Sequence, residues 1–287
     1  MKKGADVEKF ERSWLIMRAS WDVLRQDKEI LVFPVLSGIA LLLIMASFAV
    51  PVFALGGIDT VQRIARHNGT VGNLVVLFAF YFINYFVIIF FNTAIVACAT
   101  IRMRGGNPTV GDGLQASGSR LFEIAGWALV SASVGMVLRI IEERSKFVGR
   151  IVAGLLGMAW GITSYLVIPI LVNERKGPME AFQESARLLK KTWGEELIGG
   201  FSLGLVFFVL SLPAILLIAG GAASGKGFLA LGFVVLAVIY IIALSVVQAA
   251  LQGIFQAALY QYAKKGETPR GFDREILTEA ITPRAFS

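Results

Sequence analysis

The chain has 287 residues, of which 56% are hydrophobic and only 16% are charged, and its mean hydropathy is +0.71. Soluble domains carry roughly a quarter charged residues, so this composition excludes an ordinary soluble protein and favours a membrane protein. The net charge of +7 gathers beside the apolar segments. We therefore interpret it as a topology signal and expect no nucleic-acid partner.

Residues 1–29 are predicted to form a cytoplasmic amphipathic segment. They carry charge throughout and lack a short apolar core followed by a cleavage site, so we expect a retained anchor rather than a signal peptide. Apolar residues at steps of four and three predict one helical face. That face is made of Phe10, Trp14, Met17, Trp21 and Leu24.

Six long apolar runs follow, each long enough to cross roughly 30 Å of hydrocarbon. Because backbone groups in lipid must be satisfied within the segment, these runs predict helices and an all-α membrane bundle. The predicted spans are Ile30–Gly56, Val71–Ile101, Leu121–Leu138, Ile151–Val172, Leu197–Gly220 and Phe228–Tyr262. Together they define a six-helix membrane domain over residues 30–262.

The lysines and arginines predict the orientation, because cytoplasmic loops carry an excess of them. Most of the 27 positive residues lie in the N-terminal segment, in the second and fourth links, and in the tail of residues 263–287. This bias places both termini in the cytoplasm and the protein in the inner membrane. The segment Arg139–Arg150 opposes the bias, although Glu142 and Glu143 partly neutralise it.

Three junctions share one order of residues and predict three pseudo-repeats. The second, fourth and sixth spans run into "RMRGGNP", "NERKGP" and "AKKGETP", which are positive charge, glycine and then proline. Glycine lets a chain leave a helix, and proline favours the start of the next. Each unit is predicted to be a cytoplasmic amphipathic helix followed by two spans. The second such helix has the apolar face Met179, Phe182, Ala186, Leu189 and Trp193.

The aromatic faces opposite lysine and arginine are typical of helices that lie on a membrane surface. We therefore predict membrane-surface contacts for Phe10, Trp14, Met17, Trp21 and Trp193. The alternative interpretation is that these faces cover the inner ends of the helix bundle.

Small residues at fourfold spacing predict close helix packing, since they let backbones approach in lipid. Packing within the bundle is the favoured interpretation, and a homodimer seam is the alternative. The predicted packing residues are Gly149, Ala153, Gly157 and Gly161 in the fourth span, Gly200 and Gly204 in the fifth, and Gly253 in the sixth.

A polar stripe of Gln248, Gln252 and Gln256 runs along the sixth span, with Asn84 and Asn92 of the second span as predicted partners. Amide groups both donate and accept hydrogen bonds, so these residues suit an interhelical seam. The alternative is a hydrophilic pathway. We favour packing, because coupled carriers place ionisable residues inside spans and none is found in the middle of these six.

The chain has one cysteine, Cys98, and one histidine, His67. These counts leave no intrachain disulfide and no His/Cys ligand set for a metal. We therefore predict no metal, no cofactor and no catalytic site.

The two ends of the chain resemble a known family. The stretches "RSWLIMRASWDVLRQDKEILVFPVLSGIA" and "IFQAALYQYAKKGETPRGFDREILTEA" are similar to the bacterial and archaeal integral membrane family called domain of unknown function 6159. The resemblance covers essentially the whole chain and implies a polytopic membrane protein without implying an activity. The glycine–proline units more loosely resemble the membrane domain attached to some glycerophosphodiester phosphodiesterases, although this chain contains no soluble phosphodiesterase barrel.

These observations favour a non-enzymatic membrane scaffold or accessory protein that acts through lipid and protein contacts. The expected partners are membrane lipids and either another protein or a second copy of the chain. The alternative function is a transporter or channel for a lipid-like or uncharged solute. An intramembrane enzyme is the least favoured, because no nucleophile–base pair is apparent.

Overall fold

The computed structural model describes residues 2–54, 69–144, 148–193, 203–266 and 268–272. Every regular element within these ranges is helical, which confirms the all-α class. The elements are α1 (Lys2–Gln26), the 3-10 turn η1 (Lys28–Leu31), α2 (Val32–Ala54), α4 (Gly69–Met103), α5 (Val110–Gly118), α6 (Leu121–Arg144), α7 (Val148–Thr163), α8 (Val167–Glu174), α9 (Pro178–Trp193), α10 (Leu203–Ala223) and α11 (Gly227–Lys265).

Six helical segments of the described chain are long and apolar enough to cross a membrane, as predicted for a multi-pass membrane protein. They are Lys28–Val50, Leu74–Met103, Leu121–Glu143, Val148–Glu174, Val206–Ala223 and Gly227–Lys265. The helices α4, α6 and α11 extend beyond the predicted apolar runs. The 39 residues of α11 measure about 58 Å at 1.5 Å per residue, nearly twice the hydrocarbon thickness.

The chain divides into two compact units that alternate along the sequence. The first comprises Met1–Pro34, Cys98–Val110 and Leu188–Ser287, and the second comprises Val35–Ala97 and Gly111–Arg187. The predicted boundaries after residues 29 and 262 concern position in the membrane, and they remain predictions.

In the first unit, α1 packs against α10 and α11, which lie side by side as an antiparallel hairpin. The hairpin is tight at Gly221. A Cβ there would lie 2.9 Å from Cβ of Phe233 and 3.3 Å from Cα of Ala230. The absence of a side chain at Gly221 therefore allows the two backbones to approach.

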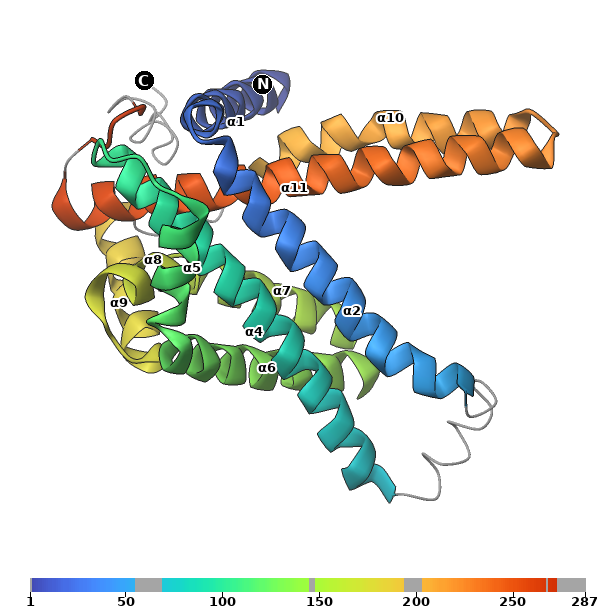
Figure 1. The fold of residues 1–287 in the computed structure, drawn as a ribbon, viewed down its shortest axis with the longest axis horizontal. Helices are drawn as coiled ribbons and strands as arrows, with labels where there is room; N and C mark the ends of the chain where they lie inside the picture. The colour runs from blue at the N-terminus through green and yellow to red at the C-terminus, as the bar shows by residue number, and fades with distance from the viewer. Residues whose placement is uncertain (1, 55–68, 145–147, 194–202, 267, 273–287) are drawn as a thin grey trace. The chain divides into compact units, whose positions relative to one another are not determined.

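In the second unit, α6 and α7 form the other antiparallel pair (Figure 1). The span that begins with α7 is broken at Ser164–Leu166, before α8 begins. The Ser185 hydroxyl of α9 bridges the break, because it donates to the Thr163 carbonyl at 2.6 Å and accepts from the Leu166 amide at 3.1 Å. A side chain thus satisfies backbone groups that the break leaves without helical partners.

The three junctions predicted to share an order of residues each contain a left-handed residue where a helix ends. These residues are Gly105 (φ 90°), Arg175 (φ 50°) and Gly266 (φ 69°). The expectation that glycine makes each exit is wrong at the second junction. There α8 already ends at Glu174, so the left-handed position falls on Arg175 rather than on Gly177. The three pseudo-repeats and their amphipathic helices remain predictions.

Candidate functional site

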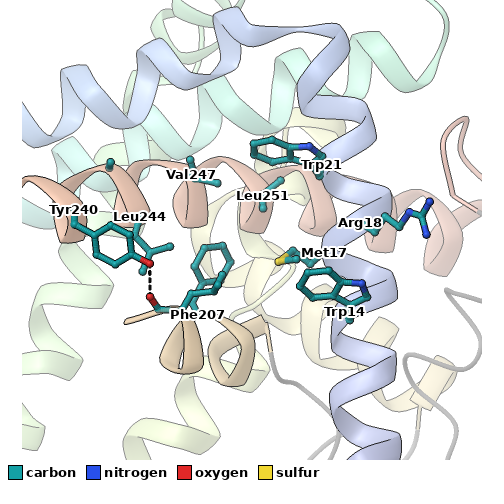
Figure 2. Close-up of a pocket in the computed structure, with 11 residues that line it drawn as sticks. Trp14, Met17, Arg18, Trp21, Phe207, Tyr240, Leu244, Val247 and Leu251 are labelled. Atoms are coloured by element: carbon teal, nitrogen blue, oxygen red, sulfur yellow. Dashed lines mark hydrogen bonds between the residues drawn. The ribbon is translucent and has the colours of Figure 1, made fainter. Parts of the chain in front are cut away.

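A groove of about 570 Å³ lies in the first unit, between α1 and the α10–α11 hairpin (Figure 2). Its walls come from three helices. The lining residues are Trp14, Met17, Arg18 and Trp21 of α1, Phe207 and Leu210 of α10, and Tyr240, Ala243, Leu244, Val247 and Leu251 of α11.

The α1 wall follows from helical periodicity, because Trp14, Met17 and Trp21 recur at steps of three and four and so share one face. Trp14 and Trp21 are 46% and 42% exposed. The adjoining face of α1, with Ile16 and Val23, is buried. The helix therefore has two apolar faces, one that is buried in the protein and one that lines the groove.

The hairpin wall is apolar even at its tyrosine. The Tyr240 hydroxyl of α11 donates a hydrogen bond to the Leu210 carbonyl of α10 at 2.6 Å, as Figure 2 shows. This bond uses the only polar atom that the hairpin side chains bring to the groove. What the hairpin offers to a ligand is therefore hydrocarbon and aromatic surface.

The α1 end of the groove is amphipathic. Arg18 borders the groove, and its guanidinium points away from Tyr240 and Leu244 (Figure 2). An arginine commonly lays its methylene stem along apolar surface while its charged head stays in a polar environment. The groove thus changes along its length, from hydrocarbon at α11 to indole and guanidinium groups at α1.

An ion pair fixes the segment that follows α1. The Asp27 carboxylate, 6% exposed, pairs with Arg102 at the end of α4. Arg102 also donates to Oδ1 of Asn107 at 2.6 Å, and the Val110 amide donates to Oε2 of Glu29 at 3.0 Å. These contacts tie the end of α1 to the link between α4 and α5, which holds one wall of the groove.

A polar cavity of about 910 Å³ lies in the second unit, among α4, α6 and α7. Its polar lining includes Tyr81, Tyr85, Glu142 and Arg150, together with the Arg139–Glu143 pair, which has an Nε–Oε1 distance of 2.8 Å. The sequence alone indicates Arg139–Arg150 only as a cluster of charge between two spans. Two tyrosines one helical turn apart were the signal that could have pointed to a polar site.

Three aromatic rings stack elsewhere in the second unit. The centroids of Trp127 and Trp160 are 5.3 Å apart, and Trp160 and Phe182 are 5.0 Å apart. Beside them, a Cβ on Gly126 would lie 2.6 Å from Cγ of Pro178. The aromatic residue Phe182 of the predicted α9 face therefore packs against α6 and α7.

The predicted glutamine stripe does not share one environment. Gln256 is buried, Gln248 is half-buried and Gln252 is exposed. Residues four apart drift by about 40° per step around a helix, which separates the three. Asn84 donates to the Phe80 carbonyl of its own helix at 2.7 Å. Asn92 is half-buried, and its pairing with the glutamines remains a prediction.

The predicted small-residue stripe of the fourth span is also divided. A Cβ on Gly149 would lie 2.5 Å from the Ile141 carbonyl oxygen of α6, whereas one on Gly161 would meet open space. Gly157 and Ala153 are both half-buried, and Ala153 lines the polar cavity. Close packing is therefore located at the α7 end nearest Gly149.

The remaining predicted residues are placed as follows. Gly253 is buried in α11 and Gly204 belongs to α10. Met17 is half-buried. Gly200 lies outside the described residues, as do the side chains of Phe10 and Trp193.

Within the described part of the chain, no three His, Cys, Asp or Glu side chains come together as a metal site requires. Cys98 is buried, and its thiol donates to the Thr109 carbonyl at 3.5 Å.

The family described as "Family of unknown function (DUF6159)" matches residues 70–271, from the start of α4 to just beyond α11. The chain belongs to this family. The predicted family is therefore confirmed, over residues 70–271. No curated protein and no solved structure matches this DUF6159 protein.

Proposed function

We propose that this DUF6159 protein is a non-enzymatic scaffold or accessory protein of the inner membrane, which acts through contacts with lipids and with another protein. The observation that carries the proposal is the apolar outer surface of the α10–α11 hairpin. Large apolar side chains are exposed on both of its helices. They include Phe208, Leu212, Ile215, Leu216 and Ile218 of α10 and Phe228, Leu231, Val235, Ile239 and Ile242 of α11.

An apolar surface of this extent requires a partner or lipid to cover it. In lipid, apolar area alone gives no drive toward association, so helices associate through close packing. Exposed glycines, such as Gly220 and Gly232 on the hairpin, provide the small surfaces that such packing uses. The hairpin is therefore suited to remain in lipid and also to accept a partner helix, either from another protein or from a second copy.

The proposed orientation places both termini in the cytoplasm. It is supported by the positive residues at the end of α11, Lys264 and Lys265, and by those of the N-terminal segment. The proposal that the protein catalyses no reaction and uses no metal is supported by its single cysteine and single histidine. The proposal that it binds no nucleic acid is supported by the position of its positive residues beside the apolar spans.

The test is to transfer the full chain from its native membrane into lipid nanodiscs and to quantify the proteins that are recovered with it. We expect a stoichiometric protein partner or a second copy of the chain. Leu231→Ser on the hairpin should lower that recovery, whereas Leu155→Ser on α7, which is equally exposed (63% and 61%), should not. Recovery of the chain alone, holding an enclosed solute, would overturn the proposal.

A transporter or channel for a lipid-like or uncharged solute is the second candidate. The polar cavity of about 910 Å³ in the second unit favours it, since solute sites combine apolar walls with a few polar groups. Counterflow of radiolabelled solutes in proteoliposomes tests this alternative, and we expect no flux above that of empty vesicles.

A further inference from the structure

We infer that the groove between α1 and the α10–α11 hairpin binds one acyl chain of an anionic phospholipid, whose phosphate group lies outside the groove beside Arg18. The inference rests on the proposed function, because it names the lipid that one surface of this membrane protein holds. Figure 2 shows the groove and Arg18 at its α1 end.

The groove selects hydrocarbon because its hairpin wall offers no free polar group. The Tyr240 hydroxyl is bonded to the Leu210 carbonyl, and the backbone of both helices bonds within each helix. A ligand that brought amide or hydroxyl groups against this wall would lose their hydrogen bonds to water without replacement. An extended peptide is therefore disfavoured, and an acyl chain is not.

The polar groups of the lining gather on α1, which predicts the position of the lipid headgroup. Trp14 and Trp21 are half-exposed indoles, and indoles prefer the boundary between hydrocarbon and polar headgroups. Within the described chain, no carboxylate lies within ion-pair distance of Arg18. Its guanidinium is thus available for a phosphate, which it can contact through two parallel hydrogen bonds.

The size of the groove fits one chain of an amphiphile. Its volume of about 570 Å³ lies within the roughly 300–1,000 Å³ of small-molecule sites. One wall belongs to predicted membrane spans and the other to the predicted surface helix. The groove is therefore expected at the boundary where the acyl chain of an inner-leaflet lipid meets its headgroup.

The first experiment is native mass spectrometry of the full chain released from nanodiscs of equal parts phosphatidylglycerol and phosphatidylcholine. We expect one retained phospholipid on the unsubstituted chain. Val247→Phe, which fills the groove, should abolish this adduct. Val238→Phe makes the same change at an exposed position of α11 outside the groove and should retain it. Equal retention by both variants would overturn the inference.

The second experiment tests the headgroup with Arg18→Gln. Because one arginine near a membrane surface contributes about 1 kcal/mol toward anionic lipid, the preference for phosphatidylglycerol should fall about fivefold while an adduct persists. Arg25→Gln is the matched control, since Arg25 is exposed on α1 and does not line the groove. An unchanged preference in Arg18→Gln would refute the assignment of the phosphate.

A third measurement needs no substitution in the hairpin. It therefore tests whether an acyl chain occupies the groove even if the Val247→Phe variant fails to fold. Phospholipids brominated in the middle of the acyl chain should quench part of the tryptophan fluorescence of the unsubstituted protein. This quenched part should be absent in the Trp14→Phe, Trp21→Phe double variant. Equal fractional quenching in both proteins would place the acyl chain elsewhere. None of these results depends on a protein partner. The lipid assignment can therefore be refuted while the proposed scaffold function stands, and the scaffold function can be refuted while the lipid assignment stands.

Discussion

The two halves of α11 differ in composition and have opposite environments. From Phe228 to Val247 most side chains are exposed, whereas from Ala250 to Gln261 all but Gln252 are buried. The exposed half reads "FLALGFVVLAVIYIIALSVV" and the buried half "ALQGIFQAALYQ". Branched aliphatic side chains dominate the first, while alanine, glycine and glutamine are frequent in the second.

This difference teaches that, in a membrane helix, the more hydrophobic half can be the exposed one. The half that packs in protein is marked instead by small residues and amides among its large side chains. Gln261 illustrates the buried half, because its Nε2 lies 3.5 Å from Sδ of Met103.

The largest expected effect is a difference in reporter activity between the two ends of α11, which we predict to lie on opposite sides of the membrane. An alkaline phosphatase fusion at Ser224, before the exposed half, should be active outside the cytoplasm, and one at Lys265, after the buried half, should be inactive. Fusions at Gly69 and Gly106 should give the same contrast for α4. Equal activity at Ser224 and Lys265 would show that α11 does not cross the membrane.

Truncating one phenylalanine in each half tests burial directly. Phe255 is 2% exposed and Phe228 is 86% exposed. Phe255→Ala leaves a cavity and should lower the free energy of unfolding by about 3 kcal/mol, whereas Phe228→Ala should change it little. Thermal unfolding in detergent, followed by circular dichroism, measures both. Similar midpoints for the two variants would contradict the contrast between the halves.

A smaller effect is expected where the exposed half packs closely against Gly221 of α10. Gly221→Ala places a Cβ against Ala230 and Phe233, which neither backbone can easily avoid, and should cost about 1–3 kcal/mol. Gly232→Ala meets open space and serves as the control. The spacing of the hairpin helices, measured by disulfide trapping of paired cysteines, should widen only in Gly221→Ala.

The smallest expected effect concerns the glutamines. Gln252→Leu, at an exposed position, should leave stability unchanged, while Gln256→Leu, at a buried one, should shift it by no more than about 1 kcal/mol. If Asn92 is the partner of a glutamine, the double change with Asn92→Leu should be nearer neutral than the sum of the single changes. Strict additivity in the unfolding free energies would exclude that pairing.

Much of this fold was predictable because spans are set by local composition. The six apolar runs and the all-α class follow from hydropathy, and periodicity alone places Trp14, Met17 and Trp21 on one face of a helix. The opposite wall of the groove was not predictable. Leu244 and Val247 look in the sequence like any lipid-facing residues, and only the tertiary packing of α1 against α11 distinguishes them.

Contacts between residues that are far apart in the sequence could likewise not be predicted from single segments. Asp27 and Arg102 are separated by 75 positions, and each alone is an ordinary charge at a helix end. The glutamine spacing predicts a stripe, but the drift of a helix at 3.6 residues per turn gives its members different environments.

The serine that bridges the broken fourth span has a consequence for the order in which the protein is made. The chain leaves the ribosome from its N-terminus, so α7 and α8 are complete before Ser185 has been synthesised. Until then the carbonyl of Thr163 and the amide of Leu166 lack the partner that the finished protein supplies. Pro169 already disfavours a continuous helix here, because it lacks the amide that would bond the Tyr165 carbonyl. We therefore expect the nascent segment to be bent at a variable angle, and the Ser185 hydroxyl to fix that angle only when α9 arrives.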